Sequence, residues 1–296
     1  MNVQSVRKAI VGANGKTGLG MKTFLYVMLT SLGFVYIYPI LHMAVTSLKS
    51  LTDLLDPSVQ WLPHQLSLDN YQKALEVMGF REHLMDTLLV SFLPSLFQTF
   101  SCALAGYAFA RFRFRGKNFW MACVLLTFIV PFPVLMVPTY TLYSDYGILG
   151  SILTMILPAV TGQGLRSAIF ILIYKAFYEQ TPASLDEAAR VDGATRFQVL
   201  KKIILPLSKP IVIYTVLTAF MGPWGDFVFA RYIAFGSSAG SNVAVGLYNW
   251  LSKDQINTRY TMFCAGGVLV AVPVTILFMC LQKYYVEGVT GGAVKG

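Results

Sequence analysis

Residues 184–206 read SLDEAARVDGATRFQVLKKIILP, a polar stretch with strongly apolar sequence on both sides. Ser184 begins one helix-capping pattern, S-x-x-E, and Thr195 begins another, T-x-x-Q. In each pattern the hydroxyl and the third residue bond one another's backbone amides. Gly193 lies between the two patterns, where a first short helix must stop and turn. The stretch therefore predicts a hairpin of two short helices, ended by Pro206, at the face of a membrane.

The composition is that of a membrane protein. Of the 296 residues, 55% are apolar and only 12% are charged, whereas soluble domains carry about 25% charged residues. A net charge of +9 could favour nucleic acid as a partner. The positive residues lie in short segments between apolar runs, however, and that distribution indicates membrane topology. We therefore expect lipid, and no nucleic acid, around this chain.

Six apolar runs are long enough to cross a bilayer. They are residues 24–45, 84–110, 119–143, 152–177, 207–230 and 260–285. The third run holds Pro131, Pro133 and Pro138, and a helix so interrupted must face a cavity or other protein, since lipid cannot bond the freed carbonyls.

Positive residues set the expected orientation, because they favour the cytoplasmic side. The predicted fold is an all-α integral membrane protein with six transmembrane helices, both termini cytoplasmic, and the hairpin in the cytoplasm between spans four and five. The predicted parts are a basic tail, a six-span domain that includes an outer loop and the hairpin loop, and a C-terminal tail. Their bounds are 1–22, 23–286 (with 46–83 and 184–206) and 287–296.

Polar side chains inside spans are functional candidates because burying them in lipid is costly. Gln163 and Arg166 lie in the fourth span, and Trp224 and Asp226 lie late in the fifth. A sugar needs paired donors and acceptors together with aromatic rings, so these four residues are candidates for a substrate pathway. The alternative is that they only hold helices together.

We find no catalytic constellation and no metal-ligand spacing in the sequence. Residues 12–17, GANGKT, have too few residues between their glycines for a phosphate loop. We therefore expect no enzyme activity, no metal and no cofactor in this chain. If the protein is a pump, another chain must supply the energy.

The hairpin resembles a known family. Glu187-Ala188-Ala189, Gly193 and the ending Ile203-x-Leu205-Pro206 match the EAA signature of ABC-importer permeases. In that family the loop forms a coupling helix that sits in a cleft of the ATPase subunit. The resemblance implies an ATPase-coupling role for Glu187, Ala188, Ala189, Asp192, Gly193, Leu205 and Pro206.

More of the chain, roughly residues 20–296, is similar to the smaller permease of maltose-type carbohydrate importers, above all the Gram-positive maltodextrin type. Residues 105–117, AGYAFARFRFRGK, resemble that family's first cytoplasmic loop. The fifth-span block departs from the family at Gly225, where many relatives have Asn. The ending resembles a tail that reaches between the two ATPase subunits. By position, this implies the same place for Thr290, Gly291, Gly292 and Lys295.

The resemblance implies an assembly in a bacterial cell membrane. Its members are this multi-pass chain, a second permease subunit, two ATPase subunits that carry ATP and magnesium, an extracytoplasmic solute-binding protein and an oligosaccharide substrate. Other readings stay open. The solute could be glycerol phosphate, a polyol or another oligosaccharide, or the chain could be an ion-driven secondary transporter; a membrane enzyme is disfavoured.

Overall fold

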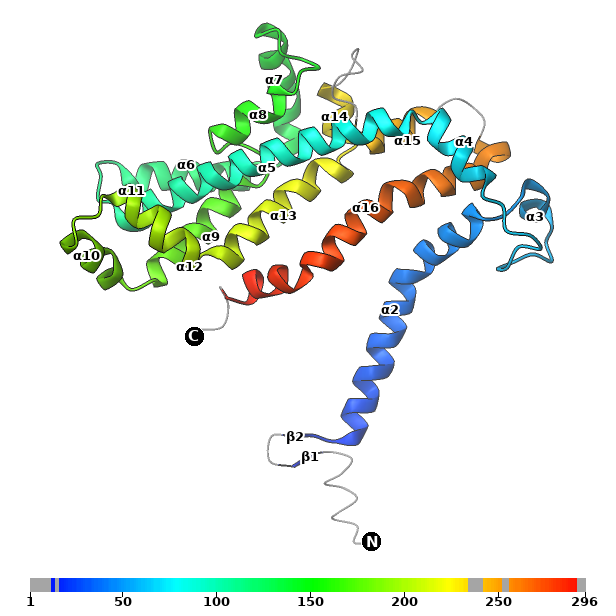
Figure 1. Cartoon of the computed structure of the whole chain (residues 1–296), viewed down its shortest axis with the longest axis horizontal. Helices are drawn as coiled ribbons and strands as arrows, with labels where there is room; N and C mark the ends of the chain where they lie inside the picture. The colour runs from blue at the N-terminus through cyan, green and yellow to red at the C-terminus, as the bar shows by residue number, and fades with distance from the viewer. Residues whose placement is uncertain (1–11, 14–15, 234–241, 252–255, 292–296) are drawn as a thin grey trace. The chain divides into compact units, whose positions relative to one another are not determined.

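The computed structural model describes residues 12–13, 16–233, 242–251 and 256–291. The regular structure of these residues is helical, except for two antiparallel two-residue strands in the basic tail, β1 (Gly12–Ala13) and β2 (Lys16–Thr17). The predicted all-α class is therefore confirmed. The chain forms two compact units, one of Met1–Ala74 with Gln255–Val268 and the other of Leu75–Asp254 with Leu269–Gly296. Figure 1 labels the elements of both.

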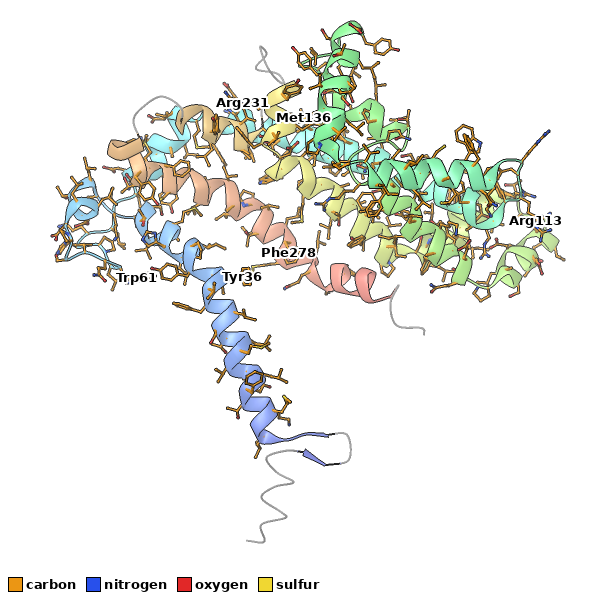
Figure 2. The ribbon with its side chains drawn as sticks, turned by 180° about the vertical axis from the view of Figure 1, so that it is seen from behind. Tyr36, Trp61, Arg113, Met136, Arg231 and Phe278 are labelled. Carbon is orange, nitrogen blue, oxygen red and sulfur yellow. The ribbon has the colours of Figure 1, made fainter. Side chains whose placement is uncertain are left out.

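The first unit is built on one long helix. It contains α2 (Leu19–Ser47), α3 (Leu51–Leu55), most of α4 (Asp69–Val77) and the start of α16 (Ile256–Gly291). None of the most apolar window of α2 is buried, and side chains such as Tyr36 stand out from the helix along its length (Figure 2). A helix that is apolar on every side is typical of a membrane span.

The segment that follows α2 is held by buried hydrogen bonds. Lys49 is buried (4% exposed), and its ammonium donates to the carbonyls of Val59 and Gln60, each at 2.9 Å. The Asn70 amide donates to the carbonyls of Ser47 at 2.9 Å and Lys49 at 2.8 Å. Because each buried polar group has partners, the beginning of the predicted outer loop is an ordered structure.

The second unit holds the remaining helices and the ends of α4 and α16. Their bounds are α5 (Phe80–Arg111), α6 (Lys117–Ile129), α7 (Phe132–Asp145), α8 (Leu153–Val160), α9 (Ser167–Gln180), α10 (Ala183–Val191), α11 (Arg196–Val199), the π-helical turn η1 (Leu200–Ile204), α12 (Leu205–Leu207), α13 (Lys209–Gly225), α14 (Val228–Ile233) and α15 (Val243–Leu251). The longest, α5, packs against α8, α9 and α13.

Small residues let α5 and α9 approach closely. A Cβ on Gly106 would stand only 2.5 Å from the Cβ of Tyr174. Tyr174 is fully buried, and its hydroxyl shares a 2.8 Å hydrogen bond with that of Thr215 on α13. Apolar side chains gain little from leaving lipid, so close packing and such hydrogen bonds hold membrane helices together.

Three helices of the described chain are long and apolar enough to cross a membrane: α2, α5 and residues Tyr260–Tyr284 of α16. Two bent pairs would raise the number to five. These are α6 with α7, bent by 103°, and Arg196–Leu207 with α13, bent by 81°. Of the three prolines predicted to interrupt the third run, Pro131 does so, since Val130 and Pro131 separate α6 from α7, whereas Pro133 and Pro138 lie within α7.

The predicted fourth span, residues 152–177, is not one continuous helix. It consists of α8, a non-helical segment at residues 161–166, and α9. Gln163 and Arg166 therefore lie in a loop between two helices and not within one continuous helix. The break follows from left-handed backbone at Gly162 (φ 70°) and Arg166 (φ 66°), a conformation that a right-handed helix does not contain.

The predicted C-terminal tail is helical over its first residues. The predicted tail begins at residue 287, but α16 stays helical to Gly291. Thr290 and Gly291 are thus in its last turn. Gly292 and Lys295 lie outside the described residues.

Candidate functional site

The polar hairpin turns at Gly193, as predicted. Helix α10 ends there, and the Ala194 amide donates to the Ala189 carbonyl at 2.9 Å while the Gly193 amide donates to the Arg190 carbonyl at 3.1 Å. These two bonds, with φ of 84° at Gly193, form a Schellman motif. Asp192 is the C-cap residue. A residue with a Cβ is strained at this φ, which is the physical reason for glycine.

Only one of the two predicted capping boxes forms. The Thr195 hydroxyl accepts from the Gln198 amide at 3.3 Å, and the Gln198 side chain accepts from the Thr195 amide at 2.7 Å. The capping box predicted at Ser184 does not form. Helix α10 begins at Ala183, one residue before Ser184, its N-cap residue is Pro182, and no side chain caps it. Ser184 is already helical, so its hydroxyl cannot take the N-cap position.

Pro206 does not end the second arm of the hairpin, contrary to prediction. The chain passes from α11 through the π-helical turn η1 into α12, which contains Pro206 and ends at Leu207. The wider turn accommodates a residue that has no amide proton to donate. The bend of 81° comes next, at Ser208, where α13 is about to begin.

The two arms of the hairpin differ in burial. Val199, Leu200 and Ile204 of the second arm are almost fully buried in the core formed with α5 and α9. Ala189 and Leu205 pack against that core, whereas Glu187, Ala188, Asp192, Gly193 and Pro206 are exposed. Three large apolar side chains of the hairpin also face outward: Leu185 (40% exposed), Val191 (88%) and Phe197 (59%).

The hairpin is tied to the end of α5 by an ion pair. The Arg111 Nε lies 3.1 Å from Asp186 Oδ2, and both side chains are largely shielded from solvent. A second nitrogen of the same guanidinium, Nη2, donates to the Thr181 carbonyl at 2.7 Å. From the sequence, residues 111–117 are interpreted only as a basic anchor. No local pattern relates Arg111 to the Asp186 carboxylate, which lies 75 residues later in the chain.

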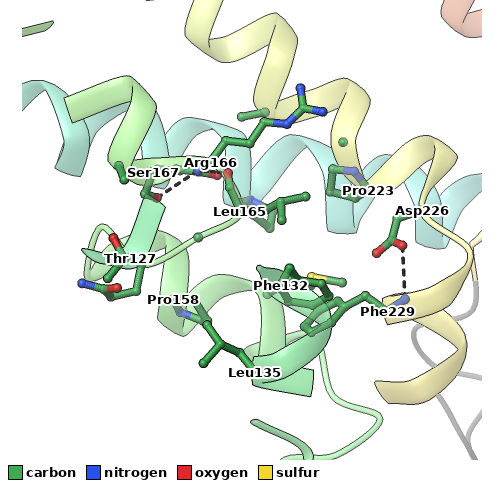
Figure 3. A pocket seen from close by; sticks show the side chains of 18 of the residues that line it. Thr127, Phe132, Leu135, Pro158, Leu165, Arg166, Ser167, Pro223, Asp226 and Phe229 are labelled. Atoms are coloured by element: carbon green, nitrogen blue, oxygen red, sulfur yellow. Dashed lines mark hydrogen bonds between the residues drawn. The ribbon is translucent and has the colours of Figure 1, made fainter. Parts of the chain in front are cut away.

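The second unit also contains a cavity of about 480 Å³. Gln163, Arg166 and Asp226 all line it. Figure 3 shows Leu165, Arg166 and Ser167 in one wall and Asp226 beside α14, where its carboxylate accepts from the Phe229 amide at 3.2 Å. The structure therefore brings three of the four predicted pathway residues to one cavity.

Trp224 is placed elsewhere. Its side chain is buried at 4% exposure, and its Nε1 donates to the Val270 carbonyl on α16 at 3.1 Å. It is not among the residues that line the cavity. This arrangement corresponds to the helix-holding alternative considered for these residues.

The broken span at the cavity is held by α5. The Gln98 amide nitrogen donates to the Leu165 carbonyl at 2.6 Å and to Ser167 Oγ at 3.0 Å. The Ser101 hydroxyl donates to the Ala159 carbonyl at 2.6 Å. Irregular backbone at membrane depth needs such partners. Sequence reasoning missed Gln98, although an amide in an apolar helix is a signal that could have found it.

Prolines mark the places where helices meet this cavity. Pro94 of α5, Pro131 between α6 and α7, Pro158 of α8 and Pro223 of α13 all line it. Pro94, Pro158 and Pro223 each remove one backbone donor from their helix, and the carbonyl that Pro158 frees, that of Thr154, accepts a hydrogen bond from the Tyr143 hydroxyl at 3.2 Å.

Comparison with known proteins identifies the family. The model of the family described as "binding-protein-dependent transport system inner membrane component" matches residues 102–291. The chain belongs to this family. The matched region contains the whole hairpin and every cavity residue named above except Gln98 and Pro94.

Curated relatives cover almost the whole of this inner membrane component. It is 31% identical over 282 residues to the maltodextrin transport system permease protein MdxG of Bacillus subtilis, covering 92% of this chain and 95% of that protein. It is 29% identical to the galactooligosaccharides transport system permease protein GanQ of Bacillus subtilis, with 92% and 95% covered. The maltodextrin permease MalD of Streptococcus pneumoniae is 29% identical, with 92% and 94% covered.

A solved structure shares the fold. It is the crystal structure of a bacterial ABC transporter involved in the import of the acidic polysaccharide alginate, and it matches with a TM-score of 0.80, covering 92% of this chain and all of that one. The identity is 20%, so this likeness concerns the fold alone. The family and the apolar helices together make the protein a multi-pass membrane component.

Proposed function

We propose that this chain is the permease subunit of a binding-protein-dependent ABC importer and forms half of the translocation pathway for an oligosaccharide, of maltodextrin type. The relatives at about 30% identity include permeases for maltodextrin and galactooligosaccharides, which supports this substrate class. The complex would contain a second permease subunit, two ATPase subunits that bind ATP and magnesium, and an extracytoplasmic solute-binding protein. This chain would bind no cofactor and catalyse no reaction.

The observation that carries the proposal is the geometry of the hairpin. The first arm presents Val191, Leu185 and Glu187 outward, and the second arm is built into the core. A short rigid helix on a buried base can fill a cleft in another protein and pass on a displacement without absorbing it. We assign ATPase coupling to Glu187, Ala188, Ala189, Asp192, Gly193, Leu205 and Pro206.

The proposed topology keeps six membrane passages in a bacterial cell membrane, with both termini and the hairpin in the cytoplasm. Helices α8 and α9 with the loop between them would make the fourth passage. The proposed parts remain residues 1–22, 23–286 and 287–296, with an outer loop at 46–83 and the coupling loop at 184–206. In the C-terminal tail, Thr290, Gly291, Gly292 and Lys295 would reach the ATPase subunits.

The cavity is the proposed place of passage. Gln163, Arg166 and Asp226 offer an amide, a cation and a carboxylate within about 480 Å³, and sugar hydroxyls bond to all three kinds of group. A cavity of a few hundred Å³ with convergent polar groups is the usual form of a small-molecule site. Trp224 would affect the pathway by fixing the end of α13 against α16.

A pair of matched glycine variants tests the coupling role. Gly193 (φ 84°) and Gly147 (φ 64°) both have left-handed backbone, and a Cβ on either would meet no atom within 4 Å. Alanine at either position costs about 1–2 kcal/mol of local strain. In the purified complex, Gly193→Ala should lower sugar-stimulated ATP hydrolysis, and Gly147→Ala should not. Equal rates of sugar-stimulated ATP hydrolysis in the two variants would refute the coupling role.

Transport by proteoliposomes tests the substrate class. Maltodextrins should enter in preference to galactooligosaccharides, glycerol phosphate and polyols, and only in the presence of ATP and the ATPase subunits. Preferred uptake of another solute would correct the substrate. Uptake that an ion gradient drives without the ATPase would refute the importer.

A further inference from the structure

The end of α5 contacts both arms of the hairpin through two adjacent residues. Arg111 bonds the Thr181 carbonyl and pairs with Asp186, in the first turn of α10. Phe112, the next residue, lies under the guanidinium of Arg196 in α11, 4.8 Å from the ring centroid. The last residue of α5 and its C-cap residue thus fasten the hairpin on each side of its glycine turn.

The Arg111–Asp186 pair is suited to setting an orientation. The two side chains are 13% and 16% exposed, and removing such charges from water offsets most of their attraction. The pair therefore adds little net stability, but its loss would leave a shielded charge without its partner. Because two different nitrogens of the planar guanidinium face Asp186 and the Thr181 carbonyl, it also restricts the angle between α10 and α5.

The same helix holds the cavity wall further toward its N-terminal end. Gln98 lies 13 residues before Arg111, about 20 Å along a helix at 1.5 Å per residue, and it bonds the Leu165 carbonyl and Ser167 Oγ. Between these two positions, Gly106 lets α5 approach α9 so closely that a Cβ there would stand 2.5 Å from the Tyr174 Cβ. One rigid element thus joins the hairpin to the broken span.

We propose that Arg111 is a positioning residue, which fixes the hairpin to α5 so that a displacement of the hairpin reaches the cavity loop at residues 161–166. The inference rests on the proposed coupling function. A residue with a purely structural role would affect only the amount of complex that assembles. A positioning residue affects how much sugar moves for each ATP hydrolysed.

The test compares Arg111→Gln and Asp186→Asn in the complete complex, reconstituted in proteoliposomes. The measured quantity is the ratio of maltodextrin transported to ATP hydrolysed, for the variants that assemble with the ATPase subunits. We expect each substitution to lower the ratio about tenfold, within the range typical of coupling between distant sites. Arg111→Lys should also lower it, since one ammonium cannot reproduce the planar fork.

Two further variants serve as a rescue and as a control. The exchange Arg111→Asp with Asp186→Arg restores opposite charges and should recover part of the ratio. Lys175→Gln removes a charge from a more exposed pair, Lys175 with Glu179 on α9, and should leave the ratio unchanged. If Arg111→Gln does not assemble, the nearly isosteric Asp186→Asn decides the question.

An unchanged ratio in Asp186→Asn and in any Arg111 variant that assembles would overturn the positioning role. The role would also be overturned if Lys175→Gln lowered the transport ratio as much as the Arg111 and Asp186 variants do. The proposed function has a separate readout in Gly193→Ala. If Gly193→Ala lowers sugar-stimulated ATP hydrolysis and Asp186→Asn leaves the transport ratio unchanged, the coupling role of the hairpin stands and the positioning role of Arg111 fails. If the wild-type complex recruits no ATPase, the proposed function itself fails.

Discussion

The close approach of α5 and α9 at Gly106 leads to a quantitative prediction for Gly106→Ala. The new Cβ would stand 2.5 Å from the Tyr174 Cβ, 3.0 Å from the Lys175 backbone nitrogen and 3.2 Å from the Ile171 carbonyl oxygen. None of these atoms can move by a change of rotamer, because each belongs to the backbone of α9 or is attached directly to it. The substitution can be accommodated only by moving the two helices apart.

The size of the effect follows from these distances. Carbon atoms in contact prefer about 3.5–4.0 Å, so the helices must separate by roughly 1 Å at this position. Overpacking of this kind costs about 1–3 kcal/mol, and the higher helix propensity of alanine returns up to about 1 kcal/mol. We expect a net loss of about 1 kcal/mol, which lowers the thermal midpoint by about 2–4 °C.

The assay is thermal unfolding of the purified chain in detergent, followed by the loss of monomeric protein on size-exclusion chromatography. The matched control is Gly33→Ala on α2, where a Cβ would meet no atom within 4 Å. This variant gains the same helix propensity without the clash, so its midpoint should equal or exceed that of the wild type. A midpoint for Gly106→Ala within a degree of Gly33→Ala would show that the two helices are not in close contact.

Three further predictions concern local contacts. Gly164→Ala would place a Cβ 2.9 Å from the Gln98 amide and displace it from the Leu165 carbonyl, so uptake per assembled complex should fall in proteoliposomes. Thr195→Ala removes the capping box and should cost about 1 kcal/mol, seen as faster hydrogen exchange of the Gln198 amide with the rest of the chain unchanged. The Asp53 carboxylate raises the pKa of His64 above 6.5, and His64 lowers the pKa of Asp53 below 3.8. The pair should therefore stabilise its loop fully between about pH 3.8 and 6.5, weaken as pH rises through the raised His64 pKa, and weaken again in acid below the lowered Asp53 pKa. In NMR titration of the ring signals, Asp53→Asn should return the His64 pKa toward 6.5, and no change in that variant would disprove the pairing.

The features that the sequence predicted well are local ones. A capping box and a glycine turn each involve residues within a few positions of one another, so Thr195 and Gly193 could be interpreted without any knowledge of the fold. The same is true of apolar runs such as α2 and α5, because length and composition alone decide whether a helix can cross a bilayer. Family membership followed from a motif of the same local kind.

The features that the sequence did not predict depend on partners far along the chain. Residues 152–177 form one largely apolar run of sufficient length for a span, but the Leu165 carbonyl is satisfied by Gln98, 67 residues earlier, and this bond allows the helix to break. Trp224 and Asp226 are close in sequence, yet one bonds Val270 and the other lines the cavity. Their separation depends on where α13 ends and on what packs beside it.

By itself, the sequence determined the type of element, the turn of the hairpin and the class of membrane protein, because neighbouring residues and hydrophobicity decide these. Tertiary structure alone decided which polar groups meet: Arg111 with Asp186, Gln98 with the broken span, and Arg166 and Asp226 at one cavity. The physical reason is that a polar group excluded from water must find a partner, and only the packing of whole helices determines which partner is within reach.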